Sequence, residues 1–178
     1  MIRYFAIVLI LVFLLSCEDD KPAEKKRIDS VETENLPDQM SWDVEVFFVD
    51  SSYTKAILRA NRSRIYQDRM ETLLDGEVVV EYMSKYSGER ISLLTADSAR
   101  IDDKTKDMIA WGDVFVKSDS SQTTLRTEVL QWENKTRKFY STEYVEIRSP
   151  SEDLNGYGFE SDQNLKNYKV FQVSGERK

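Results

Sequence analysis

Apolar and polar residues alternate with a period of two from Trp42 onward. Such alternation is typical of strands that are buried on one face only, and it covers residues 42–49 first. The nine Tyr and eight Phe of the chain also favour strands over helices. In the first stretch the alternating apolar positions are Trp42, Val44, Val46 and Phe48.

The predicted strands recur as one repeated unit. Residues 95–117 read as strand, polar turn, strand, and residues 126–148 repeat this plan without a gap. The same plan appears earlier at residues 59–81, and a shortened fourth unit spans residues 154–173. A fixed period of this kind indicates stacked supersecondary units that share one core. We therefore predict a single all-β domain made of a repetitive antiparallel sheet.

Residue parity predicts which side chains of this sheet face inward. Gly76 and Gly112 hold equivalent places in their units, and apolar residues alternate with charged ones after each. In the first strand of a unit the parity changes, because Leu58 and Ile65 are an odd number of positions apart, and this predicts a bulge or a twist between them. The six inward-facing residues of the second strands are Val78, Val80, Val114, Val116, Val145 and Ile147.

The first sixteen residues have the layout of an export signal. Arg3 precedes the apolar run Tyr4–Leu15, which would form a helix about 18 Å long, shorter than the ~30 Å hydrocarbon core of a bilayer. The end of this run, Leu14–Cys17, resembles the bacterial lipobox, which directs acylation of the cysteine. The prediction is a lipid anchor at Cys17. An ordinary cleavable signal or an uncleaved N-terminal helix is the alternative.

The segment after the cysteine is highly charged and contains Pro22 and Pro37. Such a composition cannot bury enough apolar surface to order itself, so it predicts a flexible acidic linker. The expected organisation is a signal peptide at 1–16, the lipidated cysteine and linker at 17–40, and the β domain at 41–178.

Composition excludes several functional classes. The net charge of −7 disfavours binding to nucleic acid, because phosphates are not attracted to an acidic surface. With no His and one Cys, the chain lacks the usual zinc sites and the His-dependent catalytic triads. We expect neither an enzyme nor a cofactor or metal site. The acidic residues Asp97, Asp102, Asp103 and Asp113 are interpreted as solvated side chains.

The repeat, the acidic spacer and the membrane tether together resemble the LptC-type periplasmic components of the lipopolysaccharide export system. These belong to the wider OstA-like group, whose members share a repetitive β-jelly-roll. The resemblance covers about residues 42–173 and rests on the repeated module with Gly-acid-Val-x-Val at Gly76 and Gly112. The chain departs from the best-known members in its anchor, since they carry a membrane-spanning helix and this chain has the lipobox-like Cys17.

This resemblance implies an open-sided jelly roll whose apolar trough holds the acyl chains of lipopolysaccharide. It also implies that the protein accepts the lipid from an ATP-binding-cassette export complex at the inner membrane and passes it to an LptA-like β-jelly-roll protein. The expected location is the periplasm of a Gram-negative bacterium, with the lipid anchor in a membrane, the inner one favoured. The six inward residues named above are the trough candidates, and ordinary core packing explains them equally well.

Both terminal strands of the predicted sheet could dock a partner by strand addition. Charged residues such as Lys166 could instead only protect such an edge from aggregation. The alternative function is a surface or scaffold lipoprotein with a closed β-sandwich, which binds protein or glycan through outward Trp111, Trp132 and Tyr144. The candidate edge residues are Trp42, Val44, Val46, Phe48, Lys169, Val170, Phe171 and Val173.

Overall fold

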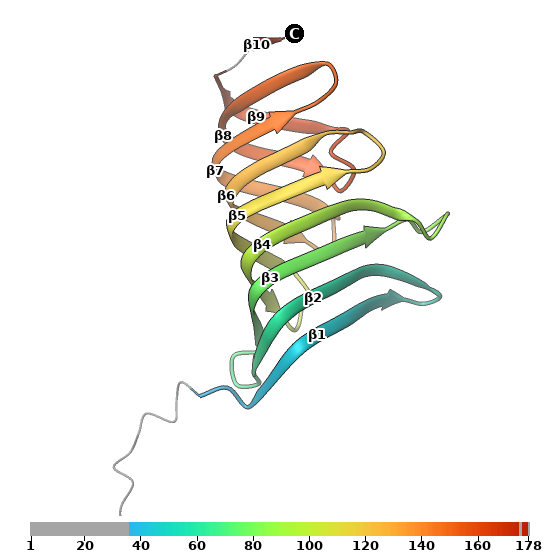
Figure 1. Cartoon of the computed structure of the whole chain (residues 1–178), viewed down its shortest axis with the longest axis vertical. Helices are drawn as coiled ribbons and strands as arrows, with labels where there is room; N and C mark the ends of the chain where they lie inside the picture. Colours follow the sequence, from blue (N-terminus) through green and yellow to red (C-terminus); the bar gives the residue numbers. More distant parts are fainter. Residues whose placement is uncertain (1–35, 175, 178) are drawn as a thin grey trace, which may run out of the picture. The chain divides into compact units, whose positions relative to one another are not determined.

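The computed structural model describes residues 36–174 and 176–177. Within them, all regular secondary structure consists of β-strands. The predicted signal peptide, Cys17 and most of the predicted linker lie outside the described residues. The ten strands form one antiparallel sheet in which β1 to β8 follow in sequence order, while β9 and β10 both pair with β8 (Figure 1). The predicted all-β fold class is confirmed. The strands are β1 (Gln39–Asp50), β2 (Tyr53–Tyr66), β3 (Glu71–Met83), β4 (Arg90–Asp102), β5 (Met108–Ser118), β6 (Thr124–Glu133), β7 (Lys138–Arg148), β8 (Glu152–Asp162), β9 (Tyr168–Val173) and β10 (Glu176–Arg177).

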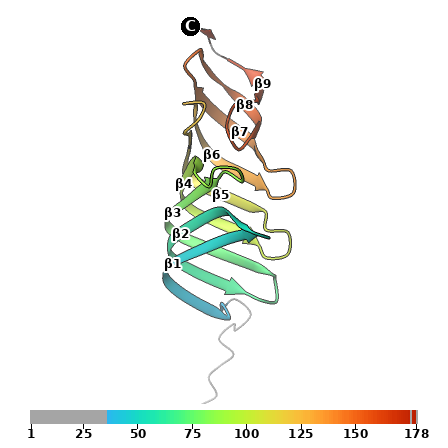
Figure 2. The same cartoon turned by 90° about the vertical axis from the view of Figure 1, so that its right-hand side faces the viewer.

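The sheet folds over on itself, so that its two halves form two facing layers (Figures 1 and 2). Tyr82 on β3 and Trp132 on β6 are three strands apart in the sheet order, yet their ring centroids are only 4.6 Å apart. An apolar sheet face must be covered by another element, and within the described residues no helix is available. The sheet therefore covers its own apolar face.

A line of bulges produces the fold between the layers, which we call the corner. The pairing of β3 with β4 shifts register between Asp75 and Val78, and the neighbouring strand pairs shift at the same level. Gly76 and Gly112 lie at this level with φ of 75° and 78°. Glycine adopts this left-handed conformation without steric cost, and a bulge bends its strand and increases the twist.

The parity change predicted for the first strand of each unit is confirmed. In β2 the buried Ala60 and Ser63 are three positions apart across the corner, whereas in β3 the buried Leu74 and Val78 are four apart. The extra residue thus lies in the second strand of each unit. It lets both strands keep their apolar side chains inside the two layers.

The space between the layers is filled by apolar side chains from every strand from β2 to β8. The inward orientation predicted for the second strands is confirmed, because all six residues are at most 3% exposed. Trp42 departs from the predicted alternation: it is 65% exposed, and the positive φ of Asp43 interrupts the strand between Trp42 and the inward Val44.

We expect Gly112→Ala to destabilise the protein more than Gly88→Ala. Both glycines have positive φ, so either substitution costs about 1 kcal/mol of backbone strain. A Cβ on Gly112 would also lie 2.5 Å from Asp97 Oδ2, whereas nothing lies within 4 Å of one on Gly88. Urea unfolding should show a loss of about 2 kcal/mol or more for Gly112→Ala. Equal losses for the two variants would contradict the close approach at the corner.

Candidate functional site: an apolar groove with a clasped mouth

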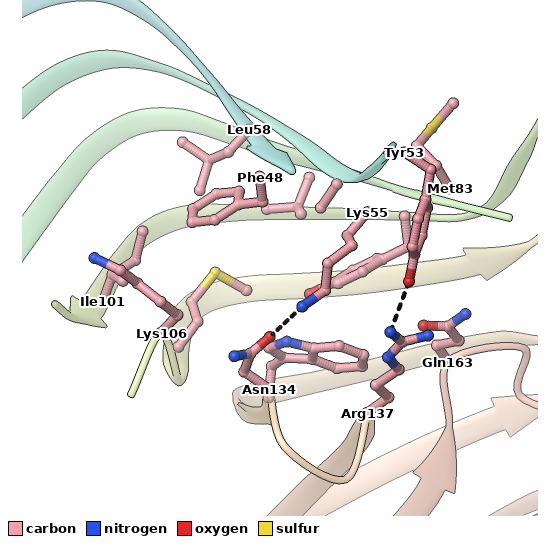
Figure 3. A pocket seen from close by; sticks show the side chains of 15 residues that line it. Phe48, Tyr53, Lys55, Leu58, Met83, Ile101, Lys106, Asn134, Arg137 and Gln163 are labelled. Atoms are coloured by element: carbon pink, nitrogen blue, oxygen red, sulfur yellow. Dashed lines mark hydrogen bonds between the residues drawn. The ribbon is translucent and has the colours of Figure 1, made fainter. Parts of the chain in front are cut away.

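A groove opens between the layers on the side opposite the corner (Figure 3). The first layer contributes the β1–β2 hairpin and the end of β3, and the second contributes the turns after β4, β6 and β8. Its empty volume is about 550 Å³, including its opening to solvent. The groove is lined by Phe48, Tyr53, Lys55, Ala56, Leu58, Val80, Tyr82, Met83, Ile101, Lys106, Met108, Trp132, Asn134, Arg137 and Gln163.

The inner wall of the groove is aromatic and aliphatic. Tyr82 packs against Trp132 at 4.6 Å and edge-on against Phe139 at 5.4 Å between ring centroids, and the last two rings are 5.0 Å apart. Phe48 and Leu58 extend this wall toward β1 (Figure 3). Such a surface suits a hydrocarbon chain, because burial of each CH₂ group is worth about 0.8 kcal/mol.

Polar side chains join the two layers across the mouth of the groove. Lys55 Nζ donates a hydrogen bond to Asn134 Oδ1 at 3.3 Å, and Arg137 Nη2 donates one to Tyr53 Oη at 2.7 Å (Figure 3). We call these four residues the clasp. The carboxylate of Asp50 lies 3.9 Å from Lys55 and 3.7 Å from Arg137, so it supports both halves of the clasp.

The mouth has a small local excess of positive charge in an acidic protein. Its cations are Lys55, Lys106 and Arg137, and within 4 Å of them lie the carboxylates of Asp50 and Asp103. Three positive charges against two negative ones contrast with the net charge of −7 of the whole chain. An anionic group at this rim would therefore meet cations although the protein as a whole is acidic.

Tyr82 is the one groove residue with a strongly shifted ionisation. Its side chain is 3% exposed, and burial raises the pKa of its hydroxyl well above the ordinary value for tyrosine. The hydroxyl is therefore neutral at physiological pH. It can donate or accept a hydrogen bond, but it provides no charge.

Of the six predicted trough residues, only Val80 lines this groove. The other five lie deeper between the layers, where they are at most 1% exposed. Their role in binding stays a prediction. Parity alone predicts neither the aromatic wall nor the clasp, because it identifies the inward positions without showing how far each lies from the mouth.

The candidate edge strands occupy the two ends of the sheet. Among the strands that the structure describes, β1 pairs only with β2, and β9 pairs only with β8. The alternative function requires Trp111, Trp132 and Tyr144 to face outward. This prediction is wrong for Trp132, which faces into the groove. Trp111 and Tyr144 are 37% and 40% exposed.

Within the described residues, no three His, Cys, Asp or Glu side chains are grouped closely enough to hold a metal ion. The four acidic residues considered in the sequence form no such group. The described part of the chain also has no helix long and apolar enough to cross a membrane.

A family model matches almost the entire chain, over residues 5–174, and its description is LptC, lipopolysaccharide-assembly, LptC-related. No curated protein matches the sequence significantly.

We expect the double variant Tyr53→Phe/Lys55→Met to open the clasp without unfolding the protein. Partly exposed hydrogen bonds are each worth about 1 kcal/mol, so the free energy of unfolding should fall by less than about 2 kcal/mol. Stopped-flow mixing with an apolar fluorophore should show uptake several-fold faster than in the wild type.

The matched control is Tyr86→Phe/Lys104→Met, which changes the same residue types at exposed positions outside the groove. It should leave the uptake rate unchanged. Equal rates in all three proteins would show that the clasp does not limit entry.

Proposed function

The chain belongs to the LptC family of lipopolysaccharide-assembly proteins, and we propose that its groove binds the acyl chains of lipopolysaccharide during transport. Members of this family are components of the lipopolysaccharide transport bridge. The chain is thus a periplasmic, membrane-associated bridge component of a Gram-negative cell, in a family not known for enzymes.

The observation that carries the proposal is an apolar path from the N-terminal edge into the groove. A second hollow of about 950 Å³, including open solvent, runs beside β1 and is mainly apolar. Both hollows are lined by Phe48, Leu58, Ile101 and Lys106, so they adjoin each other. In this proposal a hydrocarbon chain enters beside β1 and passes along Phe48, Leu58 and Ile101 to the aromatic wall.

The chemistry of the groove suits an anionic amphiphile. Its apolar wall would shelter acyl chains at about 0.8 kcal/mol per CH₂ group, while the cations at the mouth would face phosphates. The sugars would remain in water. In this proposal the six inward residues from Val78 to Ile147 form the floor beneath the acyl chains.

We propose that lipid enters at the β1 end and leaves at the β9 end. At the C-terminal end Leu165, in the loop between β8 and β9, is 1% exposed and packs into the core between the layers. Ser121 Oγ donates a hydrogen bond to the carbonyl of Asn164 and ties this loop to the one between β5 and β6. Onward passage would require this loop to move.

The partners follow from the two free edges. β1 would face the ATP-binding-cassette complex that supplies the lipid, and β9 would be extended by a strand of an LptA-like jelly-roll protein. Acylated Cys17 would hold the protein on a membrane, with the inner membrane favoured, and the acidic linker would separate it from the domain.

We expect p-benzoylphenylalanine at Phe48 to form photoadducts with lipopolysaccharide in cells, whereas the same residue at Phe47 should form none. The two positions are adjacent and accept the same aromatic change, but Phe48 lines the groove and Phe47 is 55% exposed. If folded protein gives no adduct at Phe48, acyl binding in the groove is wrong.

We expect the same photoreactive residue to identify a different partner at each edge. At Phe171 on β9, which is 64% exposed, it should capture a jelly-roll protein, and at Trp42 on β1 a subunit of the export complex. Tyr86, 96% exposed in the turn after β3, is the control and should capture neither. Exchanged partners would reverse the proposed direction of transport.

A further inference from the structure

Two buried hydroxyl groups at the mouth end of the inner face have no hydrogen-bond partner among the described residues. They are Tyr82 Oη and Ser92 Oγ, and their side chains are 3% and 0% exposed. Buried polar groups are almost always hydrogen-bonded, and leaving one unpaired is costly. Two such groups on adjacent strands therefore require an explanation.

The two residues are direct cross-strand neighbours. Tyr82 on β3 pairs with Ser92 on β4, which in turn pairs with Ser118 on β5. Ser118 is also fully buried, but its Oγ accepts a hydrogen bond from the backbone N–H of Ser121 at 3.1 Å. The hydroxyl of Ser118 is thus hydrogen-bonded, whereas those of Tyr82, which lines the groove, and of its neighbour Ser92 have no partner among the described residues.

The next row toward the corner is entirely apolar. There Leu58, Val80, Leu94 and Val116 take the positions that Ala56, Tyr82, Ser92 and Ser118 take at the mouth. If the side chains of the row at the mouth served only for packing, apolar residues would suffice there too. The change from aliphatic to hydroxyl side chains occurs where the inner face borders the groove.

We propose that Tyr82, with Ser92 beside it, forms a hydrogen-bonding subsite for an oxygen atom carried on an acyl chain, so that the groove prefers hydroxylated or ester-bearing chains to plain ones. This inference rests on the proposed function, because it specifies the kind of acyl chain that the groove holds. The ligand class is an acyl chain with a hydroxyl or ester oxygen close to its anionic head.

The surroundings of Tyr82 support a neutral ligand atom. Its ring packs against those of Trp132 and Phe139, and neither of these aromatic neighbours can accept a conventional hydrogen bond. Two of the three cations at the mouth, Lys55 and Arg137, belong to the clasp, which spans the same groove (Figure 3). A chain whose anionic head meets Lys55 or Arg137 can therefore place an oxygen a few atoms further along near Tyr82.

Myristate and 3-hydroxymyristate test the subsite, because they differ by one hydroxyl group. We would measure the binding of each to the full chain in amphipol by displacement of a fluorescent fatty acid, with empty amphipol as the blank. The wild type should prefer the hydroxylated chain about five- to tenfold, the effect of one hydrogen bond. Tyr82→Phe should reduce this preference to less than about twofold, because the aromatic ring stays and only the hydroxyl group is lost.

Two further variants complete the test. Tyr86→Phe makes the same change at an exposed position and should keep the full preference. Ser92→Ala should reduce the preference in part. The ligand-free Tyr82→Phe protein should be at least as stable as the wild type, because the substitution removes an unpaired buried hydroxyl.

Three results would overturn the inference. Equal affinity of the wild type for the two chains would remove the subsite but leave an acyl-binding groove. If the Tyr82→Phe protein is less stable than the wild type and shows no preference, the hydroxyl group of Tyr82 is hydrogen-bonded to an internal water molecule instead. Binding of neither chain would remove the subsite too, and the lipopolysaccharide adducts at Phe48 would then decide separately whether the proposed function also fails.

Discussion

The structure depends on one constraint: a sheet with an apolar face must cover that face with its own strands. The extra residue in β3, β5 and β7 meets this constraint, because the bulges lie at one level and bend the whole sheet along one line. The two layers then bury a continuous core. Gly76 and Gly112 are needed at this line because Asn61 and Asp97 approach them closely.

The same bend fixes where a ligand can enter. One long side of the folded sheet is closed by the corner, so the inner face is accessible only at the opposite mouth and at the ends. At the C-terminal part of the mouth Leu165 packs into the core from the loop between β8 and β9, and at the N-terminal part the clasp joins the start of β2 to the turn after β6. Side chains at strand ends and in turns therefore control access, and they can move without breaking the sheet.

Much of the fold was predictable because it depends on periodicity. The repeat predicted the paired strands, and the odd spacing of Leu58 and Ile65 predicted a bulge. The groove was less predictable, since its residues come from segments far apart in sequence, such as Tyr53 at the start of β2 and Arg137 in the turn after β6. No local pattern marks that contact, because it forms only after the sheet has folded over. Parity alone did not fix the orientation of the first strands, and the prediction of an outward Trp132 is therefore wrong.

The inner face also separates packing from binding. Val114, Val116 and Val145 are fully buried, so a lipid could reach them only if the layers separated and lost their mutual contacts. At the mouth the cost is smaller, because the clasp bonds are partly exposed and the hydroxyl of Tyr82 gains a partner when an oxygen-bearing chain arrives. A bridge component must also release its cargo. A site at the border of a solid core can bind an acyl chain and release it without unfolding the core.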